Sequence, residues 1–392
     1  MPLHEPIIGL PDFKIISTKG TKVIEISVEY TGDHGCIRCG SVNLRKKESY
    51  ERRLRHHCIG IQKSVLLMKT HKFYCRDCGK YFNQRIPGVQ PYQRVTELFK
   101  DQVAMEHHNG VSKKTVGRYK GVGSATVERY YRHYLKLQSH ESKNAHCPKV
   151  LGLDEKHFTK KKGYMTTFAD LKRHKVYDVA LGRSEKSLEG YLQSIPGKDN
   201  CKVVVMDLAD TYRRIAKRHF PNAMIVADRF HVVKLINHHF LKTWAQLDDE
   251  GRKSRGLLSL MRRHEWSRMK DSSRQNLQRY LDEVPGMRSV YEFKQDLMRL
   301  ILARAHSKDQ AKLLIREFLD KIRALKESNF RNLVTLGKTL ENWMEEIVRM
   351  WRFSKTNSIT EGLHRRMDEI LNRAYGMRNF DNFRIRVKAF CG

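Results

Sequence analysis

Residues 201–207 read Cys-Lys-Val-Val-Val-Met-Asp, the most strand-like run in the chain. Two further runs have the same form, a short apolar stretch that ends in aspartate: Val150-Leu-Gly-Leu-Asp154 and Met224-Ile-Val-Ala-Asp228. Short apolar runs are typical of strands that are buried on both faces of a sheet. The three runs therefore predict the centre of a buried sheet.

The segments between these runs complete the pattern. Residues 164–170 and 176–181 flank a basic turn and predict two hairpin-linked strands. Helical patterns occupy residues 187–195 and 211–220, each ahead of a later strand. Three strands, helix, strand, helix and strand predict a mixed sheet with helices on its faces.

The rest of the C-terminal part is helical in period. This pattern runs from about residue 232 to 351, where no strand candidate occurs. A further helix is predicted over residues 358–375, with Gly376 at its C-cap position. The predicted breaks in the long helical region lie near Gly251, Pro285-Gly286, Ser307 and Asn329.

Two CxxCG units stand ahead of the sheet, at residues 36–40 and 75–79. Each turn directs two thiolates at one centre, and the glycine that follows allows the positive φ that lets backbone amides face the sulfurs. Four thiolates form the tetrahedral set that zinc prefers, and a site filled by protein is structural rather than catalytic. The predicted Zn²⁺ ligands are Cys36, Cys39, Cys75 and Cys78.

The zinc prediction has alternatives. The four cysteines could be unrelated thiols, although the scattered remaining cysteines favour metal binding over a disulfide framework in a cytoplasmic chain. Basic clusters between the pairs are typical of a zinc ribbon with a phosphate-facing hairpin, and alternating stretches within residues 13–28 predict a small hairpin before it. Substitute ligands are Cys58, His56, His57 and His71.

Residues 94–137 are helical in pattern, with breaks at Asn109-Gly110 and at the glycine turn 120–123. Ser124 is the predicted N-cap of the helix after that turn. A helix-turn-helix would place this second helix in the major groove, whereas a plain helical hairpin has the same periodicity. The polar groups that the helix would offer to DNA are Thr126, Arg129, Arg132 and His133.

The charge of the chain indicates a polyanionic partner. Lys and Arg number 76 against 43 Asp and Glu, which gives a formal net charge of +33 over 392 residues. Nucleic-acid binding is the commonest use of such an excess, because each neutralised phosphate releases counterions. Ribosome association and solubility alone are the alternatives. The charge spreads along the whole chain and predicts a long footprint on double-stranded DNA.

Composition also bounds the compartment. A hydrophobic share of 40% with only nine prolines predicts a globular protein. No apolar run approaches the roughly 20 residues that a membrane helix needs, and the N-terminus lacks the features of a signal peptide. We expect a cytoplasmic, nucleoid-associated protein with no membrane partner.

Asp154 and Asp207 each end an apolar strand. Carboxylates at neighbouring strand ends can share divalent cations, which activate a water or 3′-hydroxyl and stabilise the leaving oxygen at phosphorus. No protein nucleophile is then required, which fits a chain without G-x-S-x-G, P-loop or G-x-G-x-x-G motifs. For either aspartate alone, the alternative is an N-cap of the segment that follows.

Glu361 begins the last predicted helix, in Asn357-Ser-Ile-Thr-Glu361-Gly. With Ser358 it also forms a capping box, which explains the glutamate without catalysis. On a helical wheel it lies with Arg365 and Asp368, opposite the apolar stripe that Leu363 and Met367 belong to. Periodicity alone therefore does not place Glu361 against the sheet.

These features together resemble bacterial insertion-sequence transposases of the IS-L-three family over nearly the whole chain. The cysteine pairs resemble the family's zinc finger, and residues 94–137 resemble its helix-turn-helix. Five further motifs resemble parts of the family's catalytic domain. They are Val150-Leu-Gly-Leu-Asp154-Glu, Val204-Val-Met-Asp207-Leu, Ile225-Val-Ala-Asp228-Arg-Phe-His231, Asn357-Ser-Ile-Thr-Glu361-Gly and Arg373-Ala-Tyr-Gly-Met-Arg-Asn-Phe380.

The resemblance implies an RNase H-like DDE transposase that uses Mg²⁺ or Mn²⁺. Its metal ligands would be Asp154, Asp207 and Glu361, and Asp210 is a rival for the second position. His231 ends a [C/D]xxH signature and would orient the scissile phosphate or brace the site, unless it is a core histidine. An all-helical insertion would span about residues 240–350, where Trp244, Trp266, Trp343 and Trp351 are expected in the core.

The expected function is binding of terminal inverted repeats, hydrolysis to expose 3′-hydroxyls and strand transfer into target DNA, by a homodimer or larger assembly. A non-catalytic, co-opted DNA-binding regulator and a nuclease that does not join strands are the alternatives. The expected domains are residues 1–91 (hairpin and zinc module), 92–138 (helix-turn-helix) and 148–392 (catalytic domain with its insertion).

Overall fold

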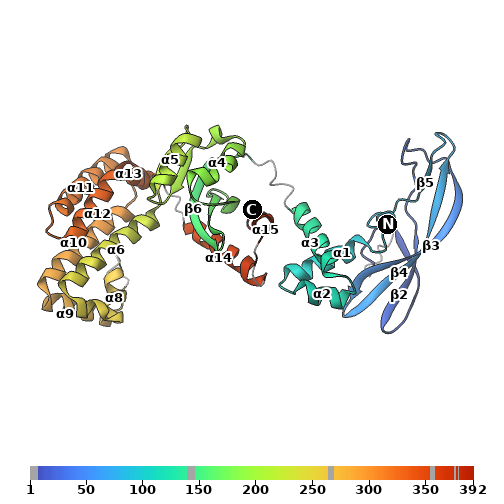
Figure 1. Ribbon diagram of the computed structural model, residues 1–392, viewed down its shortest axis with the longest axis horizontal. Helices are drawn as coiled ribbons and strands as arrows, with labels where there is room; N and C mark the ends of the chain where they lie inside the picture. Colours follow the sequence, from blue (N-terminus) through green and yellow to red (C-terminus); the bar gives the residue numbers. More distant parts are fainter. Residues whose placement is uncertain (1–7, 139–145, 264–268, 354–357, 375–376, 378) are drawn as a thin grey trace. The chain divides into compact units, whose positions relative to one another are not determined.

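The computed structural model describes residues 8–138, 146–263, 269–353, 358–374, 377 and 379–392. It divides into two compact units, Met1–Gln138 with Arg373–Gly376, and Ser139–Asn372 with Met377–Gly392. Figure 1 labels the helices and strands of both units.

A five-stranded sheet forms the first part of the N-terminal unit. Its strands are β1 (Phe13–Lys19), β2 (Val23–Tyr30), β3 (Leu44–Ile59), β4 (Gln62–Cys75) and β5 (Tyr81–Asn83), in the order β1-β2-β4-β3 with β5 paired to β4. The small hairpin predicted within residues 13–28 is confirmed as β1 and β2. It is not separate from the zinc module, because β2 also pairs in parallel with β4.

Strands β3 and β4 form one long antiparallel hairpin between the two cysteine pairs. Ile26, Leu54 and Leu66 from three strands are at most 1% exposed and form the centre of the sheet's core. The first half of β3 is exposed throughout, since residues 45–51 are all exposed, and this half carries three basic residues outward. A basic hairpin therefore lies between the two cysteine pairs, as predicted.

Three helices follow: α1 (Glu97–His108), α2 (Lys113–Lys120) and α3 (Ser124–Gln138). The Ser112 side chain caps α2 by accepting a hydrogen bond from the Thr115 amide, and Gly121 ends it with a φ of +66°. The prediction for Ser124 was wrong by one position. It is the first residue of α3, whose first free amides are taken by the Gly123 carbonyl.

The C-terminal unit contains the predicted mixed sheet. Its strands are β6 (Val150–Thr159), β7 (Gly163–Asp170), β8 (Lys175–Leu181), β9 (Val203–Met206) and β10 (Met224–Ala227), in the order β10-β9-β6-β7-β8. The first three pair antiparallel, whereas β9 and β10 continue the sheet in parallel. Helices α4 (Glu185–Ser194) and α5 (Asp210–His219) precede β9 and β10, so the predicted order is confirmed.

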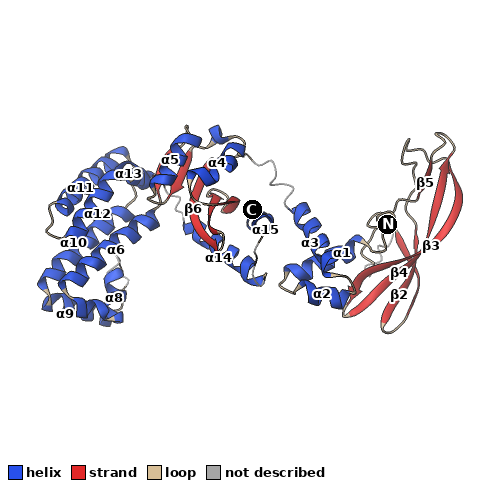
Figure 2. Cartoon of the chain, in the orientation of Figure 1, coloured by secondary structure: helices blue, strands red, loops and turns tan. Residues whose placement is uncertain are grey.

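The described residues between 229 and 352 are helical, and Figure 2 shows no strand among them. Their core joins that of the sheet, and Trp244, Trp343 and Trp351 are at most 3% exposed, as expected. Trp266 lies outside the described residues. The helices are α6 (Arg229–Leu247), α7 (Asp249–Lys253), α8 (Arg255–Arg262), α9 (Asp271–Glu283), α10 (Pro285–Leu302), α11 (Lys308–Lys326), α12 (Arg331–Asn342) and α13 (Met344–Arg352).

Two helices close the chain, α14 (Ser358–Arg373) and α15 (Phe380–Cys391). The predicted helix end at Tyr375 and Gly376 lies outside the described residues. Helix α15 was not predicted. It packs on β8, where Arg384 donates to the buried Asp178 carboxylate over 2.8 and 2.7 Å.

Candidate functional site

The four cysteines of the CxxCG units meet at one point. Their sulfurs all lie within 4.8 Å of one another, with 3.5 Å between Cys36 and Cys78 and 3.7 Å between Cys39 and Cys75. A tetrahedron with Zn–S bonds of about 2.3 Å has edges of about 3.8 Å, whereas a disulfide needs about 2.05 Å. The sulfur geometry fits zinc and excludes two disulfides.

Backbone turns of the same form shape the two ends of this cluster. The Gly40 amide donates to the Cys36 carbonyl over 2.9 Å, and the Gly79 amide donates to the Cys75 carbonyl over 3.0 Å. Both glycines have positive φ, +75° and +70°, as the sequence predicted. Burial raises the pKa of the Cys36 thiol, but backbone hydrogen bonds from Arg38 and Cys39 bring it down to about 6. This favours the thiolate that zinc binds at Cys36, whereas burial and hydrogen bonds with the other thiols raise the pKa of Cys78 to about 12.

The substitute ligands lie elsewhere. The buried His56 contacts the Thr96 hydroxyl and the Ile8 carbonyl, each over 2.9 Å. Cys58 accepts from the Lys120 ammonium over 3.2 Å. Neither belongs to the four-sulfur cluster.

The polar groups predicted for DNA contact lie on one side of α3. Arg129, Arg132 and His133 are exposed and Thr126 is half-buried. The opposite side buries Val127, Tyr131 and Leu135 against α1 and α2. Glu128 fixes Arg132 over 2.9 Å. The helix therefore presents a polar, mainly basic face.

Three aspartates lie in one row across the parallel strands. Asp207 and Asp228 directly follow β9 and β10, whereas Asp154 lies within β6, which continues to Thr159 and does not end at Asp154 as predicted. Leu153 of β6 is the register partner of Met206 of β9, so Asp154 and Asp207 are the next residues on neighbouring strands. Met206 also pairs with Ala227 of β10, which places Asp228 in the same row. Neighbouring strands lie about 4.8 Å apart. The sheet thus places the two predicted acids on neighbouring strands and adds a third, although among the described residues the ligand atoms of the three do not all lie within 4.8 Å of one another.

The electrostatics of this row are those of buried, crowded carboxylates. Burial, followed by repulsion from Asp207 and Asp228, raises the pKa of Asp154 to about 7. Burial, and after it repulsion from the Glu155 and Asp228 carboxylates, raises the pKa of Asp207 to about 6. The Asp207 Oδ1 atom is buried without a hydrogen-bond partner. A divalent cation would stabilise such carboxylates.

Asp228 has a second role. It is 2% exposed and caps α6 by accepting from the Phe230 amide over 3.2 Å. An N-cap is the alternative role that the sequence left open for Asp154 and Asp207. Asp228 follows an apolar strand as Asp207 does, and that signal was present in the sequence.

Two imidazoles flank the Asp154 carboxylate. His231 Nε2 lies 4.0 Å from Asp154 Oδ1 and 3.5 Å from Asp228 Oδ2. His364 of α14 lies on the other side, with Nδ1 3.9 Å from Asp154 Oδ2. Its Nε2 is 3.0 Å from the hydroxyl of Thr167, the register partner of Asp154 on β7. Burial lowers the pKa of both imidazoles, that of His364 to about 4, so both are neutral near pH 7.

His364 was missed in the sequence. It follows Leu363, which is 2% exposed, and shares a helix face with Thr360 and Met367, both fully buried. A helical wheel could have placed it on the edge of the buried stripe. Its approach to Asp154 depends on how α14 packs.

The structure leaves Glu361 outside this group. Its side chain is 55% exposed and accepts from Arg365 over 2.9 Å. Among the described residues, the ligand atoms of Asp154, Asp207 and Glu361 do not all lie within 4.8 Å of one another. The Ser358 side chain, and with it the capping box, lies outside the described residues. Asp210, the rival ligand, is 68% exposed and lies 3.6 Å from Arg213.

One other set of acidic and histidine side chains gathers in this unit. Glu185, Glu189 and His219 have ligand atoms within 4.8 Å of one another. Arg218 donates to Glu185 over 2.9 Å, and Arg214 lies 3.8 Å from the same carboxylate. We assign this set to an ion-pair network between α4 and α5.

Comparison with known proteins shows the family of the chain. Residues 151–387, more than half of the chain, match a family model described as Transposase, the DDE transposase domain of family ISL3. The chain belongs to transposase family ISL3. Residues 84–135 match the helix-turn-helix domain of the same family. The family resemblance inferred from the motifs is confirmed. The prediction of an insertion-sequence transposase with a DNA-binding helix-turn-helix is confirmed as well.

A curated relative spans nearly the whole length. The chain is 24% identical over 374 residues to the transposase for insertion sequence element IS1001 of Bordetella parapertussis. The match covers 90% of this chain and 88% of that protein. Within the described part of the chain, none of the helices is both long and apolar enough to cross a membrane.

The raised carboxyl pKa values predict a pH-dependent stability. A carboxyl with a raised pKa stabilises the fold fully below its unfolded value, near 3.8, and this contribution is lost as pH rises through about 6 to 7. Without divalent cations, we expect the Tm of the wild type to fall between pH 5 and 8. The fall should exceed that of the double variant Asp154→Asn/Asp207→Asn by several degrees. Mg²⁺ or Mn²⁺ should reverse this fall in the wild type only, as measured by differential scanning fluorimetry.

The paired variant is the control for every other titrating group. Histidines of lowered pKa far from the carboxylates, such as His56 of the N-terminal unit, contribute equally to both proteins and cancel in the difference. Equal pH profiles for the two proteins, or equal responses to Mg²⁺, would contradict the prediction.

Proposed function

We propose that this transposase binds the terminal inverted repeats of its element, hydrolyses a strand at each end and joins the freed 3′-hydroxyl to target DNA. The observation that carries the proposal is the row of Asp154, Asp207 and Asp228 across three parallel strands, within β6 and at the ends of β9 and β10. Membership of the family supports DNA as the substrate.

The fold that we propose for the catalytic domain is RNase H-like with an all-helical insertion. Three antiparallel strands followed by two helix–strand repeats support the first part. Helices α6 to α13, which stand between β10 and α14, support the second. The division of the chain at residues 91/92 and near 148 stays a prediction.

The residues present fit Mg²⁺ or Mn²⁺. Asp207 has a buried carboxylate oxygen without a hydrogen-bond partner, and oxygen ligands are those that both cations prefer. Bound there, the cations would polarise the scissile phosphate and lower the pKa of the attacking water or hydroxyl. Asp154 and Asp207 would hold them, with Glu361 as the proposed third ligand.

The neighbouring side chains would hold Asp154 in place. His364 is fixed by the Thr167 hydroxyl and faces Oδ2, while His231 faces Oδ1. Neither nitrogen is within hydrogen-bond distance of Asp154, so the two neutral imidazoles would limit the space open to its carboxylate without neutralising it. We propose His231 as a residue that braces the site. DNA ends would be recognised by Thr126, Arg129, Arg132 and His133 of α3.

One assay separates this proposal from its alternatives. The purified protein is incubated with Mg²⁺ or Mn²⁺, a labelled duplex from the end of its element and a plasmid target. Cleavage at the end followed by joining to the plasmid is the expected result. Binding without cleavage would indicate a co-opted regulator, and cleavage without joining would indicate a nuclease.

Two DNA ends must be handled together, so we propose a homodimer or larger assembly on DNA. Light scattering of the protein with its end duplex should give at least two chains per complex. A single chain per cleaved duplex would contradict this.

Glu361→Gln distinguishes a metal ligand from a helix cap. Glutamine also serves at this position of a capping box, so Tm should stay within about 1 °C of the wild type. A metal ligand cannot be replaced by a neutral amide without loss, and we expect cleavage to fall by about 10²-fold or more. Arg365→Ala is the matched control, because it removes the observed partner of Glu361 and leaves the carboxylate. Full activity of Glu361→Gln would restore the capping interpretation.

A further inference from the structure

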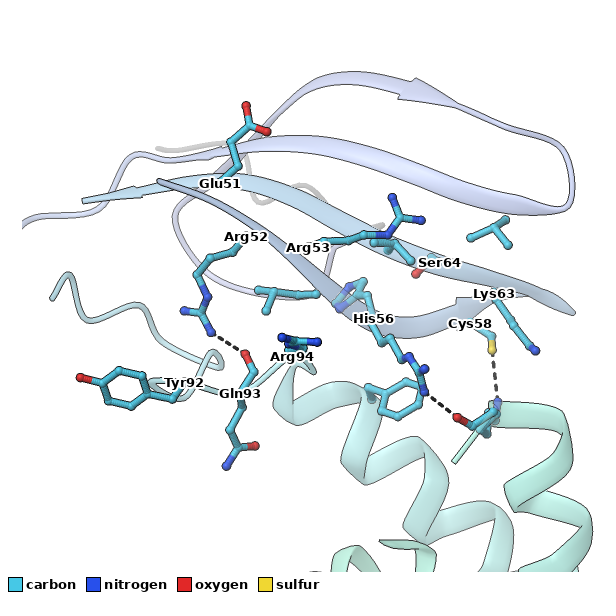
Figure 3. Close-up of a pocket in the computed structure, with 17 residues that line it drawn as sticks. Glu51, Arg52, Arg53, His56, Cys58, Lys63, Ser64, Tyr92, Gln93 and Arg94 are labelled. Carbon is cyan, nitrogen blue, oxygen red and sulfur yellow. Dashed lines mark hydrogen bonds between the residues drawn. The ribbon is translucent and has the colours of Figure 1, made fainter. Parts of the chain in front are cut away.

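A basic cavity lies in the N-terminal unit, where the zinc-module sheet meets the helices. Its volume is about 690 Å³, within the range of ligand sites. It is bounded by β3, by the segment 92–94 that leads into α1, and by Gly121 at the end of α2 (Figure 3). The transposase proposal above leaves this cavity without a role.

Four cations of the lining have no carboxylate within ion-pair distance among the residues that the structure describes. Arg52 donates to the carbonyls of Gln90 and Gln93, over 3.2 and 2.6 Å. Arg55 donates to the Gly121 carbonyl over 2.7 Å. These bonds position two guanidinium groups without neutralising them. Lys63 and Arg94 are exposed.

The remaining cations of the lining are balanced. Arg53 is paired with Glu25, and Lys120 is paired with Glu106 over 2.6 Å. Glu51 is the one acidic residue that lines the cavity. The excess positive charge therefore belongs to Arg52, Arg55, Lys63 and Arg94, and it calls for an anion.

Tyr92 adds a second observation at the rim. Its side chain is 91% exposed, yet its backbone has a φ of +60°, a region that a bulky residue rarely adopts. The ring contributes nothing to the core and is positioned by a hydrogen bond from Asn83 to its hydroxyl, over 3.3 Å. An exposed aromatic residue held in an unfavourable backbone conformation is typical of a ligand-binding position.

The position of the cavity identifies the anion. Gly121 begins the turn that leads to Ser124, the first residue of α3, three residues further on. A recognition helix contacts bases with its N-terminal residues, so the adjacent surface faces the sugar-phosphate backbone beside that groove. We propose that the cavity binds phosphates of the DNA strand that flanks the groove read by α3. This rests on the proposed role of α3.

The predicted effects follow from counterion release. Arg94→Ala and Lys63→Ala should each weaken binding of the full chain by about 3- to 10-fold at 0.1 M salt. Each should also reduce the slope of log affinity against log salt concentration by about 1. Tyr92→Gly should weaken binding while Tm stays at or above the wild-type value, because glycine adopts positive φ freely. Fluorescence anisotropy over a KCl series measures all three.

Two duplexes and two comparison variants make the test specific. Binding is measured to the end duplex and to a scrambled duplex of equal length. Phosphate contacts predict equal losses on both, whereas Arg132→Ala should reduce mainly the preference for the end. Lys14→Ala, which removes an exposed cation of β1 outside the cavity, should keep the wild-type slope.

Wild-type affinity and slope in Arg94→Ala, Lys63→Ala and Tyr92→Gly would overturn the proposal, whatever Arg132→Ala does. Losses confined to the end duplex would overturn it as well, because they would indicate base contacts. If the wild type binds the end duplex no more tightly than the scrambled duplex, the proposed recognition of DNA ends by α3 is wrong. The slopes on the scrambled duplex still decide the cavity in that case.

Discussion

Asp154→Asn is expected to slow strand cleavage by about 10³-fold or more while DNA binding stays unchanged. Metal ions at a phosphoryl centre stabilise the transition state by several kcal/mol, and about 4 kcal/mol corresponds to about 10³-fold. Asparagine keeps the size of the side chain and removes the charge that holds the cation. Single-turnover cleavage of a labelled end duplex, beside anisotropy of the same duplex, measures both quantities.

Asp207→Asn should give a loss of the same order, since Asp207 is the register neighbour of Asp154. Asp210→Asn is the matched control, because this side chain is 68% exposed and lies beside Arg213. We expect it to cleave within about 3-fold of the wild type. Cleavage by Asp154→Asn within about 10-fold of the wild type would contradict the assignment, and a larger loss in Asp210→Asn than in Asp207→Asn would transfer the second ligand to Asp210.

The same substitution at Asp154 should stabilise the protein when no metal is present. A carboxylate held in a buried row at pH 8 destabilises the fold, because burial and two neighbouring acids raise its pKa to about 7. The asparagine that replaces it would carry no charge, so Tm should rise in the variant that has lost activity. Opposite changes in stability and activity are expected of a site built for a ligand.

Local patterns in the sequence predicted those parts of the sites that local geometry determines. A CxxCG turn fixes two thiolates within five residues, so Cys36, Cys39, Cys75 and Cys78 could be assigned before the fold was known. Asp154 and Asp207 could be paired because each follows an apolar run, and parallel strands present such positions at one edge of a sheet. The continuation of β6 past Asp154 to Thr159 was not predicted. Neither assignment needed the distant packing of the chain.

The unpredicted features depend on contacts between distant segments. His364 reaches Asp154 only because α14 packs against β6 and β7, about 200 residues away in sequence. Strands β2 and β4 pair in parallel, although the whole first CxxCG unit lies between them in the sequence. The basic cavity needs Arg55 beside Gly121, 66 positions apart. Asp228 was passed over for another reason, since it carries a cap and a site position together.

Loss of zinc is the second large effect that we expect. Structural zinc in small finger domains contributes about 10–16 kcal/mol of apparent binding free energy near pH 7. The hydrophobic cluster beside the four thiols is small, with Phe73 and Phe82 as its buried aromatic residues. Cys75→Ser removes a ligand that is fully buried, and should release the ion and unfold this end of the β3–β4 hairpin.

The consequence for DNA binding follows from where the basic residues lie. Strand β3 starts at Leu44, five residues after Cys39, and Arg52 and Arg55 lie further along it. We expect Cys75→Ser to contain less than one-tenth of an equivalent of zinc and to bind the end duplex at least about 10²-fold more weakly. Cys58→Ser is the control for zinc content, because this thiol lies on the same hairpin outside the cluster.

The two proposed metals can be distinguished by experiment, because we propose that they serve different steps. Omitting Mg²⁺ should abolish cleavage and leave binding unchanged, whereas a zinc chelator without Mg²⁺ should abolish binding itself. The second core of the N-terminal sheet, which includes Ile26, Leu54 and Leu66, does not touch the thiols, so part of the unit should stay folded. A metal-free protein that keeps wild-type affinity would show that the cluster does not organise the DNA-binding surface. Zinc content by mass spectrometry, circular dichroism and anisotropy, measured on one preparation, decide between these outcomes.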